Sequence, residues 1–514
     1  MRLALAAWSA AALLLATPLA AQVTPITVPK GQLRWDFYAQ LESWDWRWRD
    51  GAREEAAAAF ARPIVDQAFL PGLADTEARL KRMTGLSQLN LSLGQSIASQ
   101  IVNRGTRGIG GAFGLTKSIT VYGSVPVVSV RVEPRFVLDT TSSTLGANPG
   151  GAQYATFLNQ LATALAALQS RIASGAFDPD PNLKALAQAR LTYGQMLRAD
   201  LLALVNDPAT ASPFLPTASS QVGASLINQI QALQSDLAAF GVTGFTASLS
   251  LPTRRASVDD FTTYLTDPTG AVAGRPLDEV PYLIRLGDVE VGVAVALIDR
   301  FPRSRMGHGM RTTLDATLRL RTGQLDRQDR FLDVGTGDRQ PDVDVNLSTD
   351  LALGRFGVRL VGGYNLQLPG NQNRRIGPPD QPIGAATTQA GVRRDPGDVI
   401  RLSARPFLRL ATHLSLYGGV DFWTRRADKF VYAAGQPPID GADIDVLAIG
   451  TKADALLLSG GLSYSHSGED KRGALGLPMD ASFRYERVAR SGSGILPDIN
   501  SVRVDLRFYT RLWR

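Results

Sequence analysis

The chain has 514 residues, of which 44% are hydrophobic and 20% are charged, and its formal net charge is +7. It contains no cysteine and only three histidines, His308, His413 and His466. This composition excludes disulfides, thiolate metal sites and cysteine nucleophiles, and it leaves little material for a histidine-rich metal site. The basic residues form no long block, so nucleic acid is not an expected partner. We expect no cofactor and no bound metal.

The first 21 residues have the pattern of a secretory signal peptide. Arg2 precedes an apolar run from Leu3 to Leu15, and small residues end the segment at Ala21. A membrane anchor is the alternative, but the apolar run is shorter than the ~20 residues that a spanning helix requires. We therefore expect cleavage before Gln22, and export. An exported soluble protein and a β-barrel remain possible, because no later stretch resembles a spanning helix.

A period of two residues recurs along the rest of the chain. In the segment 500–513, Val504 and Leu506 alternate with Arg503 and Asp505. One apolar and one charged face is the pattern of a strand between two different solvents. A soluble sandwich also alternates, but long segments with a heavily charged second face favour tilted membrane-spanning strands.

About twelve such strands are predicted, an even number that places both termini on one side of a membrane. The segments are 31–48, 86–112, 119–135, 286–299, 310–322, 342–353, 356–368, 399–411, 414–425, 455–466, 480–490 and 500–513. In the first of them the phase slips near Ser43. We expect a β-bulge there, with Trp44, Trp46 and Trp48 at the membrane interface.

Short and long connections alternate between these strands. The tight turns are 114–118, 354–355 and 411–413, and the long connections are 49–85, 136–285, 323–341, 369–398 and 426–454. Outer-membrane barrels have short periplasmic turns and longer outer loops. Both termini are therefore expected in the periplasm, where the segment from Gln22 to Lys30 has the position to plug the mouth of the barrel.

In the longest predicted connection, the period of two residues is replaced by a helical spacing. Leucines recur at spacings of three and four residues in 152–172, 183–205 and 226–240, which predicts three amphipathic helices on the extracellular side. A packing module is the simplest interpretation, and a lid, a docking surface or a block of the lumen are the alternatives. A weaker helical pattern covers Glu54 to Ala61 and Thr76 to Met83.

The predicted organisation has four parts. They are a signal peptide at 1–21, a first barrel part at 22–135 with a helical connection at 49–85, a largely helical extracellular insert at 136–285, and a second barrel part at 286–514. The fold class is an all-β transmembrane antiparallel barrel with an inserted α-helical subdomain.

Short motifs occur in a fixed order along 86–370. They are Phe113 to Ser118 with Val121 to Pro126, Leu286 to Val291, Leu318 to Gly323, and Val334 to Gly337 followed by Asp342. This ordered set resembles the phenol-degradation meta-pathway family of outer-membrane proteins, which is similar to long-chain fatty-acid transporters. Arg321 stands where that family has proline, and the helical insert is larger than is usual there. The resemblance implies passage of small hydrophobic or aromatic molecules.

The charged strand faces are expected to line the lumen, because a charge on the lipid face near the midplane costs ~2–4 kcal/mol. The residues are Asp288, Glu290, Asp315, Arg319, Arg321, Asp342, Asp344, Asp350, Arg359, Arg401, Arg405, Arg409, Asp421, Arg425, Arg503, Asp505, Arg507 and Arg511. They form either an arginine-lined conduit that attracts anions or a network of salt bridges that fills a narrow barrel.

Three functions follow from these patterns. The first is an outer-membrane channel or transporter, the second a non-conducting scaffold that displays the helical domain to a partner, and the third an outer-membrane hydrolase. His466-Ser467 is the only suggestive catalytic neighbour pair, and HExxH, GxSxG and P-loop motifs are absent. The acidic loop 333–344 could hold Ca²⁺ only loosely. We expect a non-enzyme whose partners are the outer-membrane lipid bilayer, the barrel-assembly machinery and a small-molecule solute.

Overall fold

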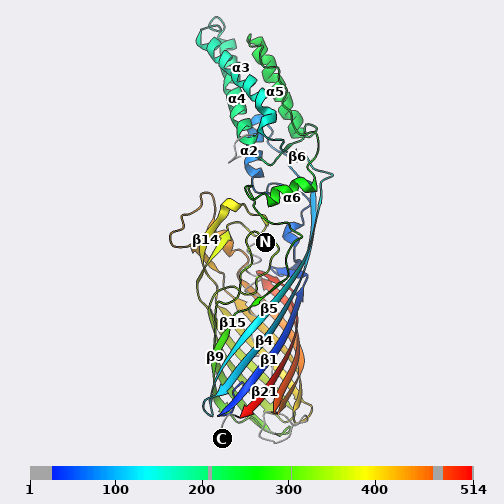
Figure 1. Ribbon diagram of the computed structural model, residues 1–514, viewed down its shortest axis with the longest axis vertical. Coiled ribbons are helices and arrows are strands. Elements are labelled where there is room, and N and C mark those ends of the chain that lie inside the picture. Colours follow the sequence, from blue (N-terminus) through cyan, green and yellow to red (C-terminus); the bar gives the residue numbers. More distant parts are fainter. Residues whose placement is uncertain (1–25, 206–210, 303, 467–477, 512–514) are drawn as a thin grey trace.

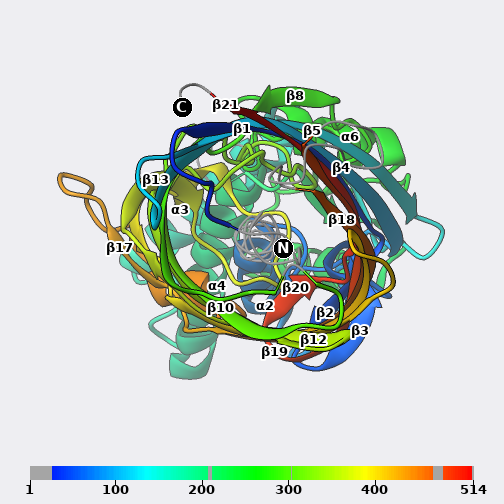
Figure 2. The same ribbon diagram turned by 90° about the horizontal axis from the view of Figure 1, so that it is seen from below.

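The computed structural model describes residues 26–205, 211–302, 304–466 and 478–511, so the predicted signal peptide lies outside it. Twelve strands form one closed antiparallel barrel (Figures 1 and 2). In chain order they are β1 (Gln32–Trp44), β4 (Gln95–Gly114), β5 (Ile119–Asp139), β9 (Glu290–Asp299), β10 (His308–Arg319), β11 (Asp342–Leu353), β12 (Phe356–Gln367), β15 (Val399–Arg409), β16 (Leu414–Arg425), β18 (Ala453–His466), β19 (Met479–Ser493) and β21 (Asn500–Arg511). The predicted fold class and the number of strands are confirmed.

The barrel closes through its first strand. Ala39 of β1 pairs with Val504 of β21 on one side and with Arg107 of β4 on the other. All other barrel strands pair with their neighbours in chain order. The predicted strand 286–299 is interrupted: β8 (Leu283–Leu286) and β9 both pair with β5, and Asp288 lies in the break between them.

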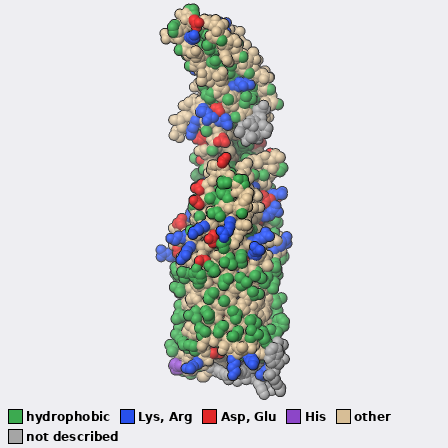
Figure 3. Space-filling model, turned by 90° about the vertical axis from the view of Figure 1, so that its left-hand side faces the viewer, with side chains coloured by type: hydrophobic (Ala, Val, Ile, Leu, Met, Phe, Trp, Pro, Cys, Tyr) green, Lys and Arg blue, Asp and Glu red, His purple; other side chains and the backbone are tan. Residues whose placement is uncertain are grey.

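The outer face of the barrel is apolar. Along β11, Val345 and Leu347 are exposed, whereas Asp344, Asn346 and Ser348 are buried. Figure 3 shows hydrophobic side chains gathered in a band across the visible face of this part of the molecule, with lysine and arginine above and below it. An apolar outer band on a closed antiparallel barrel is the architecture of a protein that crosses a membrane with strands.

A search of the described helices finds none with the length and apolar composition needed to cross a bilayer.

Three helices extend far beyond one end of the barrel (Figure 1): α3 (Ala155–Ala173), α4 (Pro181–Val205) and α5 (Gln221–Ala239). Their leucine stripes are buried, with Leu161 and Leu168 completely inaccessible, as the three- and four-residue spacing predicts. Below them lie α2 (Leu73–Thr84) and α6 (Val258–Thr266). The weaker helix predicted from Thr76 to Met83 is not assigned to the bundle from the sequence. In the structure it is α2, and its Arg79 and Arg82 form ion pairs with Asp200 of α4.

Two predictions near the first strand are wrong. The chain leaves the barrel after Trp44, and β2 (Trp46–Arg49) pairs with β3 (Ala52–Glu55) and β20 (Ile495–Pro497) instead. Trp44 is 1% exposed and belongs to the apolar core, so it does not face a membrane interface. The segment predicted as a helix from Glu54 begins in β3, because Glu54 forms an ion pair with Arg47 across the β2–β3 hairpin.

Smaller elements lie between the barrel and the three long helices, beyond the end of the barrel that we call the helix end. They are a sheet of β13 (Gly370–Arg375), β14 (Gln389–Asp395) and β17 (Lys429–Tyr432), a pair of β6 (Leu145–Ala147) and β7 (Phe214–Pro216), and the 3-10 helices Ala58–Phe60, Gly151–Tyr154, Ala386–Thr388 and Ile444–Ala448. The opposite end, with the connections 115–118, 300–307, 354–355 and 410–413, is called the turn end.

One apolar core joins the barrel to the helices. It includes Val102 and Val128 on the inner wall, Phe331 and Leu332 of the connection between β10 and β11, and Leu161 of α3. The inner wall is therefore apolar at the helix end. Polar and charged side chains occupy most of the remaining length, and two small apolar clusters lie at the turn end.

Candidate functional site: the charged interior of the barrel

The inner wall of the barrel is built from the buried half of each alternating strand. On β10 the buried side chains include Asp315, Thr317 and Arg319, and the strand pairs with β11, where Asp342 and Asp344 are buried. Since adjacent strands present paired residues on the same face, these charges meet inside the barrel. The interior consequently contains ionised groups within short distances of one another.

Asp350 of β11 holds two arginines. Its carboxylate accepts hydrogen bonds from Arg311 of β10 at 2.6 Å and from Arg359 of β12 at 2.5 Å. All three side chains are less than 10% exposed. A buried carboxylate between two guanidinium groups is a strong charge-assisted arrangement, and it ties three consecutive strands together near the turn end.

Arg319 forms the complementary arrangement at the other end of β10. Its guanidinium donates to Asp342 at 2.8 Å and to Glu290 at 3.3 Å, so one cation bridges two acids. The side chain is 4% exposed. The carboxylates come from β9 and β11 on either side of β10, because Arg319 pairs in register with both residues.

Further ion pairs continue around the barrel. They are Arg401 with Asp344, Arg405 with Asp421, Arg503 with Asp505, Arg484 with Glu486, Arg104 with Glu42 and Arg34 with Asp36. Arg503 also lies over the ring of Tyr38, 4.3 Å from its centroid. Positive and negative side chains therefore alternate over much of the inner wall.

The predicted interior residues differ in where they lie. Those that are buried are Asp288, Glu290, Asp315, Arg319, Asp342, Asp344, Asp350, Arg359, Arg405, Arg409, Arg425, Arg503 and Asp505. Arg401, Asp421 and Arg507 are half-buried. Arg511 is exposed at the end of β21, and Arg321 is exposed beyond the end of β10, where the alternation no longer applies because the strand has stopped. The prediction for Arg321 is therefore corrected.

Several interior charges were missed from the sequence. They are Arg34, Asp36, Glu42, Arg104, Arg311, Arg484 and Glu486. Arg484 and Glu486 alternate with exposed Phe483 and Tyr485, so the same period of two was sufficient to find them. Arg104 was hidden because Asn103, Gly105 and Arg107 interrupt the apolar outer face of β4 beside it.

Several buried side chains carry polar atoms that make no hydrogen bond within the described residues, and Arg405 and Asp315 are two of them. Nε and Nη1 of Arg405 and Oδ1 of Asp315 make no hydrogen bond within this part of the chain. Buried polar atoms of this kind are normally satisfied by water. The interior is therefore a polar environment that water can hydrate, and it differs in this respect from an apolar protein core.

The start of the described chain enters the barrel at the turn end. Val28 is 2% exposed and packs with Ala112 and Tyr509 of the wall. Its backbone N–H donates to Oγ1 of Thr120 at 2.8 Å, and the carbonyl of Ile26 accepts from Arg34 at 3.0 Å. Figure 2 shows this segment turning from β1 toward the middle of the opening. The described part of the predicted plug, residues 26–30, thus lies inside the mouth.

The connection between β10 and β11 covers the helix end. Phe331, Leu332 and Val334 are buried, and the Leu332 carbonyl accepts a hydrogen bond from Gln100 of β4 at 3.1 Å. Burial raises the pKa of Asp338 in this connection to about 6. Burial likewise raises the pKa of Asp333 to about 6. Segments of the chain therefore occupy both ends of the charged interior.

The residues of the hydrolase hypothesis lie at the turn end. The rings of His413 and His466 are 4.7 Å apart, and Nδ1 of His413 contacts the Ser465 carbonyl at 3.0 Å. Ser467, the other member of the pair with His466, lies outside the described residues. Within the described chain, no group of three or more histidine, aspartate or glutamate side chains is arranged to hold a metal ion.

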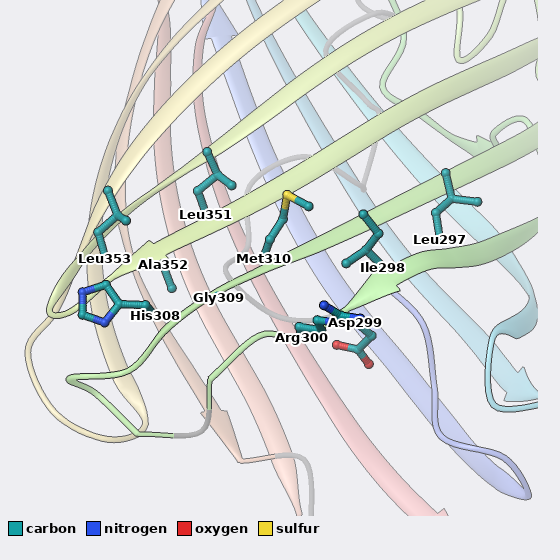
Figure 4. Close-up of a pocket in the computed structure, with 10 residues that line it drawn as sticks. All are labelled: Leu297, Ile298, Asp299, Arg300, His308, Gly309, Met310, Leu351, Ala352 and Leu353. Carbon is teal, nitrogen blue, oxygen red and sulfur yellow. The ribbon is translucent and has the colours of Figure 1, made fainter.

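A hollow on the outer face of the barrel is separate from this interior. It lies across β9, β10 and β11 at the turn end, where Met310, Leu351 and Leu353 project from the strands (Figure 4). The register of β9 and β10 shifts between Thr312 and Thr313, and such a bulge opens the wall locally. Because its lining is mainly apolar, the hollow belongs to the lipid-facing surface.

No protein-family model and no curated protein matches the chain. Many solved structures align with nearly its whole length, and three of them serve as examples. The COG4313 outer membrane channel from Pseudomonas putida F1 has a TM-score of 0.41 and 10% identity, over 95% of this chain and 99% of that one. The transport unit of the autotransporter AIDA-I from Escherichia coli has a TM-score of 0.33 and 6% identity, over 99% of both chains. The Pseudomonas putida toluene transporter TodX has a TM-score of 0.23 and 11% identity, over 98% of this chain and 94% of that one. A likeness of this degree does not extend to the solute.

Proposed function

We propose that this protein is an outer-membrane channel for small molecules, and that its solutes are hydrophobic or aromatic. The observation that carries the proposal is the contrast between the two faces of the barrel. The outer face is an apolar band, and the inner face has hydratable charged groups such as Arg405 and Asp315. Outer-membrane barrels that pass solutes have a polar interior of this kind.

The alternation of connection lengths supports an orientation. Connections at the turn end are short, and the opposite end carries the helices and the long segments. Outer-membrane barrels place their short turns in the periplasm. In this proposal both termini are periplasmic, the helical insert at 136–285 is extracellular, and the chain is inserted by the barrel-assembly machinery.

Passage in this proposal requires chain segments to move aside. Residues 26–30 occupy the turn end, and the connection with Phe331 and Leu332 occupies the helix end. The charged wall between them belongs to a twelve-stranded barrel, whose diameter lies between that of an eight-stranded barrel filled by side chains and that of a wide porin. We therefore expect low conductance and uptake of individual small molecules, in place of a wide aqueous pore.

Conductance and uptake in reconstituted membranes test the proposal. The full chain is inserted into planar bilayers and into liposomes, beside a variant in which Ile26, Thr27 and Val28 are replaced by glycine. The variant is expected to conduct more, because three side chains that are less than 10% exposed leave the mouth of the barrel. A Met306→Ala variant, altered at an exposed residue of the same end, is the control.

Two outcomes contradict the channel. One is a folded barrel that passes neither ions nor solute in any variant, including one that lacks residues 140–280. The other is a barrel whose only measurable property is binding of a protein partner by the helical insert, which would favour the scaffold hypothesis.

A further inference from the structure

Phe301 extends from the connection between β9 and β10 into the turn end of the barrel. Its ring lies 6.5 Å from the ring of Phe407 on β15, and it packs on the buried pair of Phe407 and Tyr417. Two guanidinium groups face the same ring, that of Arg311 at 4.7 Å and that of Arg409 at 5.7 Å from its centroid. One aromatic ring is thus surrounded by two aromatic and two cationic side chains.

The four surrounding side chains are held in place by groups other than Phe301. Arg311 is fixed by Asp350 at 2.6 Å, and the hydroxyl of Tyr417 donates to the Phe483 carbonyl at 3.3 Å. Arg409 donates to the Gly354 carbonyl at 2.5 Å, in the turn between β11 and β12, which is separate from the connection that carries Phe301.

Phe407 is held by the shape of the wall. It lies opposite Gly357 on β12, where a Cβ atom would come within 2.2 Å of its ring. The glycine therefore leaves the space in which the aromatic ring lies flat against the strand. Since Phe407 is 3% exposed and Tyr417 is 4% exposed, while Phe301 itself is only half-buried, the surrounding groups form the fixed part and Phe301 the inserted part.

We propose that Phe407, Tyr417, Arg311 and Arg409 form a binding site for a small single-ring aromatic molecule, and that Phe301 occupies the place of that ring. We call these four residues the aromatic cage. Guanidinium groups attract the face of an aromatic ring, and neighbouring aromatic side chains add offset or edge contacts. An aliphatic ring of equal size has no such face, so the cage distinguishes aromatic from saturated molecules.

The inference deepens the proposed channel function by giving its lumen a specific site. A solute that travels along the barrel axis reaches the cage at the turn end, and it must displace Phe301 to bind. The same contact that closes this part of the mouth therefore selects the molecule that opens it.

Binding of two matched anions tests the cage. Benzenesulfonate and cyclohexanesulfonate carry the same charge and a similar volume, but only the first is aromatic. Titration calorimetry on the full, folded chain compares wild type with Phe301→Ala. The variant is expected to bind benzenesulfonate measurably more tightly than wild type and about two- to thirtyfold more tightly than cyclohexanesulfonate, the range of a cation–π contribution of ~0.5–2 kcal/mol.

Three further variants complete the experiment. Phe301→Ala combined with Phe407→Ala should lose the preference for the aromatic anion, and Met306→Ala, an exposed residue of the same connection, should behave as wild type. Phe301→Leu keeps an apolar side chain on the connection and serves where the alanine variant does not fold, with the same preference expected. Equal affinity for the two anions in the folded Phe301 variants would overturn the proposal.

Conductance, measured separately, distinguishes this proposal from the channel itself. A chain that binds benzenesulfonate selectively but conducts nothing contradicts the channel and leaves the cage standing. A chain that conducts but shows no aromatic preference contradicts the cage alone.

Discussion

Asp350 shows how a single residue holds the interior together. Its carboxylate is 3% exposed and neutralises Arg311 and Arg359 on the strands to either side. Removing one partner of a buried ion pair leaves a charge without compensation, which costs much more than the pair contributes. At this position the loss of one carboxylate would leave two such charges.

Asp350→Ala is therefore expected to destabilise the folded barrel by about 3–5 kcal/mol, the usual cost of an uncompensated buried charge. The free energy of unfolding is measured by urea titration of the chain folded into lipid vesicles. Asp178→Ala is the control, because Asp178 pairs with Lys184 on an exposed surface and such pairs contribute ~1 kcal/mol or less. Equal effects of the two substitutions would show that Asp350 has no structural role in the interior.

At the scale of elements, the barrel strands could be predicted and the departures from them could not. The period of two is visible wherever a strand separates lipid from a polar interior, as in β11 and β21. Trp44, Trp46 and Trp48 continue an alternating pattern, but the chain leaves the barrel after Trp44, and β2 pairs with the adjacent hairpin strand β3 and with β20, which is distant in sequence. Local periodicity contains no information about which partner strand a segment will find.

The candidate site was predictable to a similar degree. The interior position of Arg319 or Asp344 follows from alternation, whereas the partner of each depends on register between strands. The position of Phe301 could not be predicted from periodicity, because Phe301 lies in a short connection. Its contacts come from the three strands that surround it.

The connection between β10 and β11 is an element whose stability should depend on pH. Burial raises the pKa values of Asp333 and Asp338 to about 6, compared with the ordinary value near 4. At pH values between about 4 and about 6, the folded connection binds more protons than the opened connection. Its stability is therefore highest at low pH and falls as the pH rises through about 6.

Hydrogen exchange of a peptide covering 324–340, corrected for the intrinsic effect of pH, measures this dependence. Protection is expected to be greater at pH 4.5 than at pH 7.5. Asp338→Asn, which keeps the shape but cannot ionise, should reduce the difference, and Asp329→Asn in the more exposed part of the connection should not. Unchanged protection across this range in the wild-type chain would contradict the predicted role of these carboxyl groups.

At the scale of the whole molecule, the apolar band defines which part of the barrel lies in lipid. Leu347 is 46% exposed near the middle of β11, and Leu353 is 63% exposed at the end of the same strand, beside the turn. Both side chains point outward, since Leu347 pairs with Leu314 and Leu353 with His308 on the outer face of β10. One strand thus offers two outward-facing positions, one near the middle of the apolar band and one near its edge.

Leu347→Arg is expected to destabilise the barrel by about 2–4 kcal/mol and Leu353→Arg by about 1 kcal/mol or less, because the cost of a lipid-facing arginine falls from the midplane to the interface. The two free energies are compared in lipid vesicles, and again in detergent micelles, where the difference should shrink because a micelle rearranges around the charge. Equal costs in vesicles would place Leu347 outside the hydrocarbon region. The axis of the barrel would then not cross the membrane along β11, and the polar interior would have no membrane to bridge.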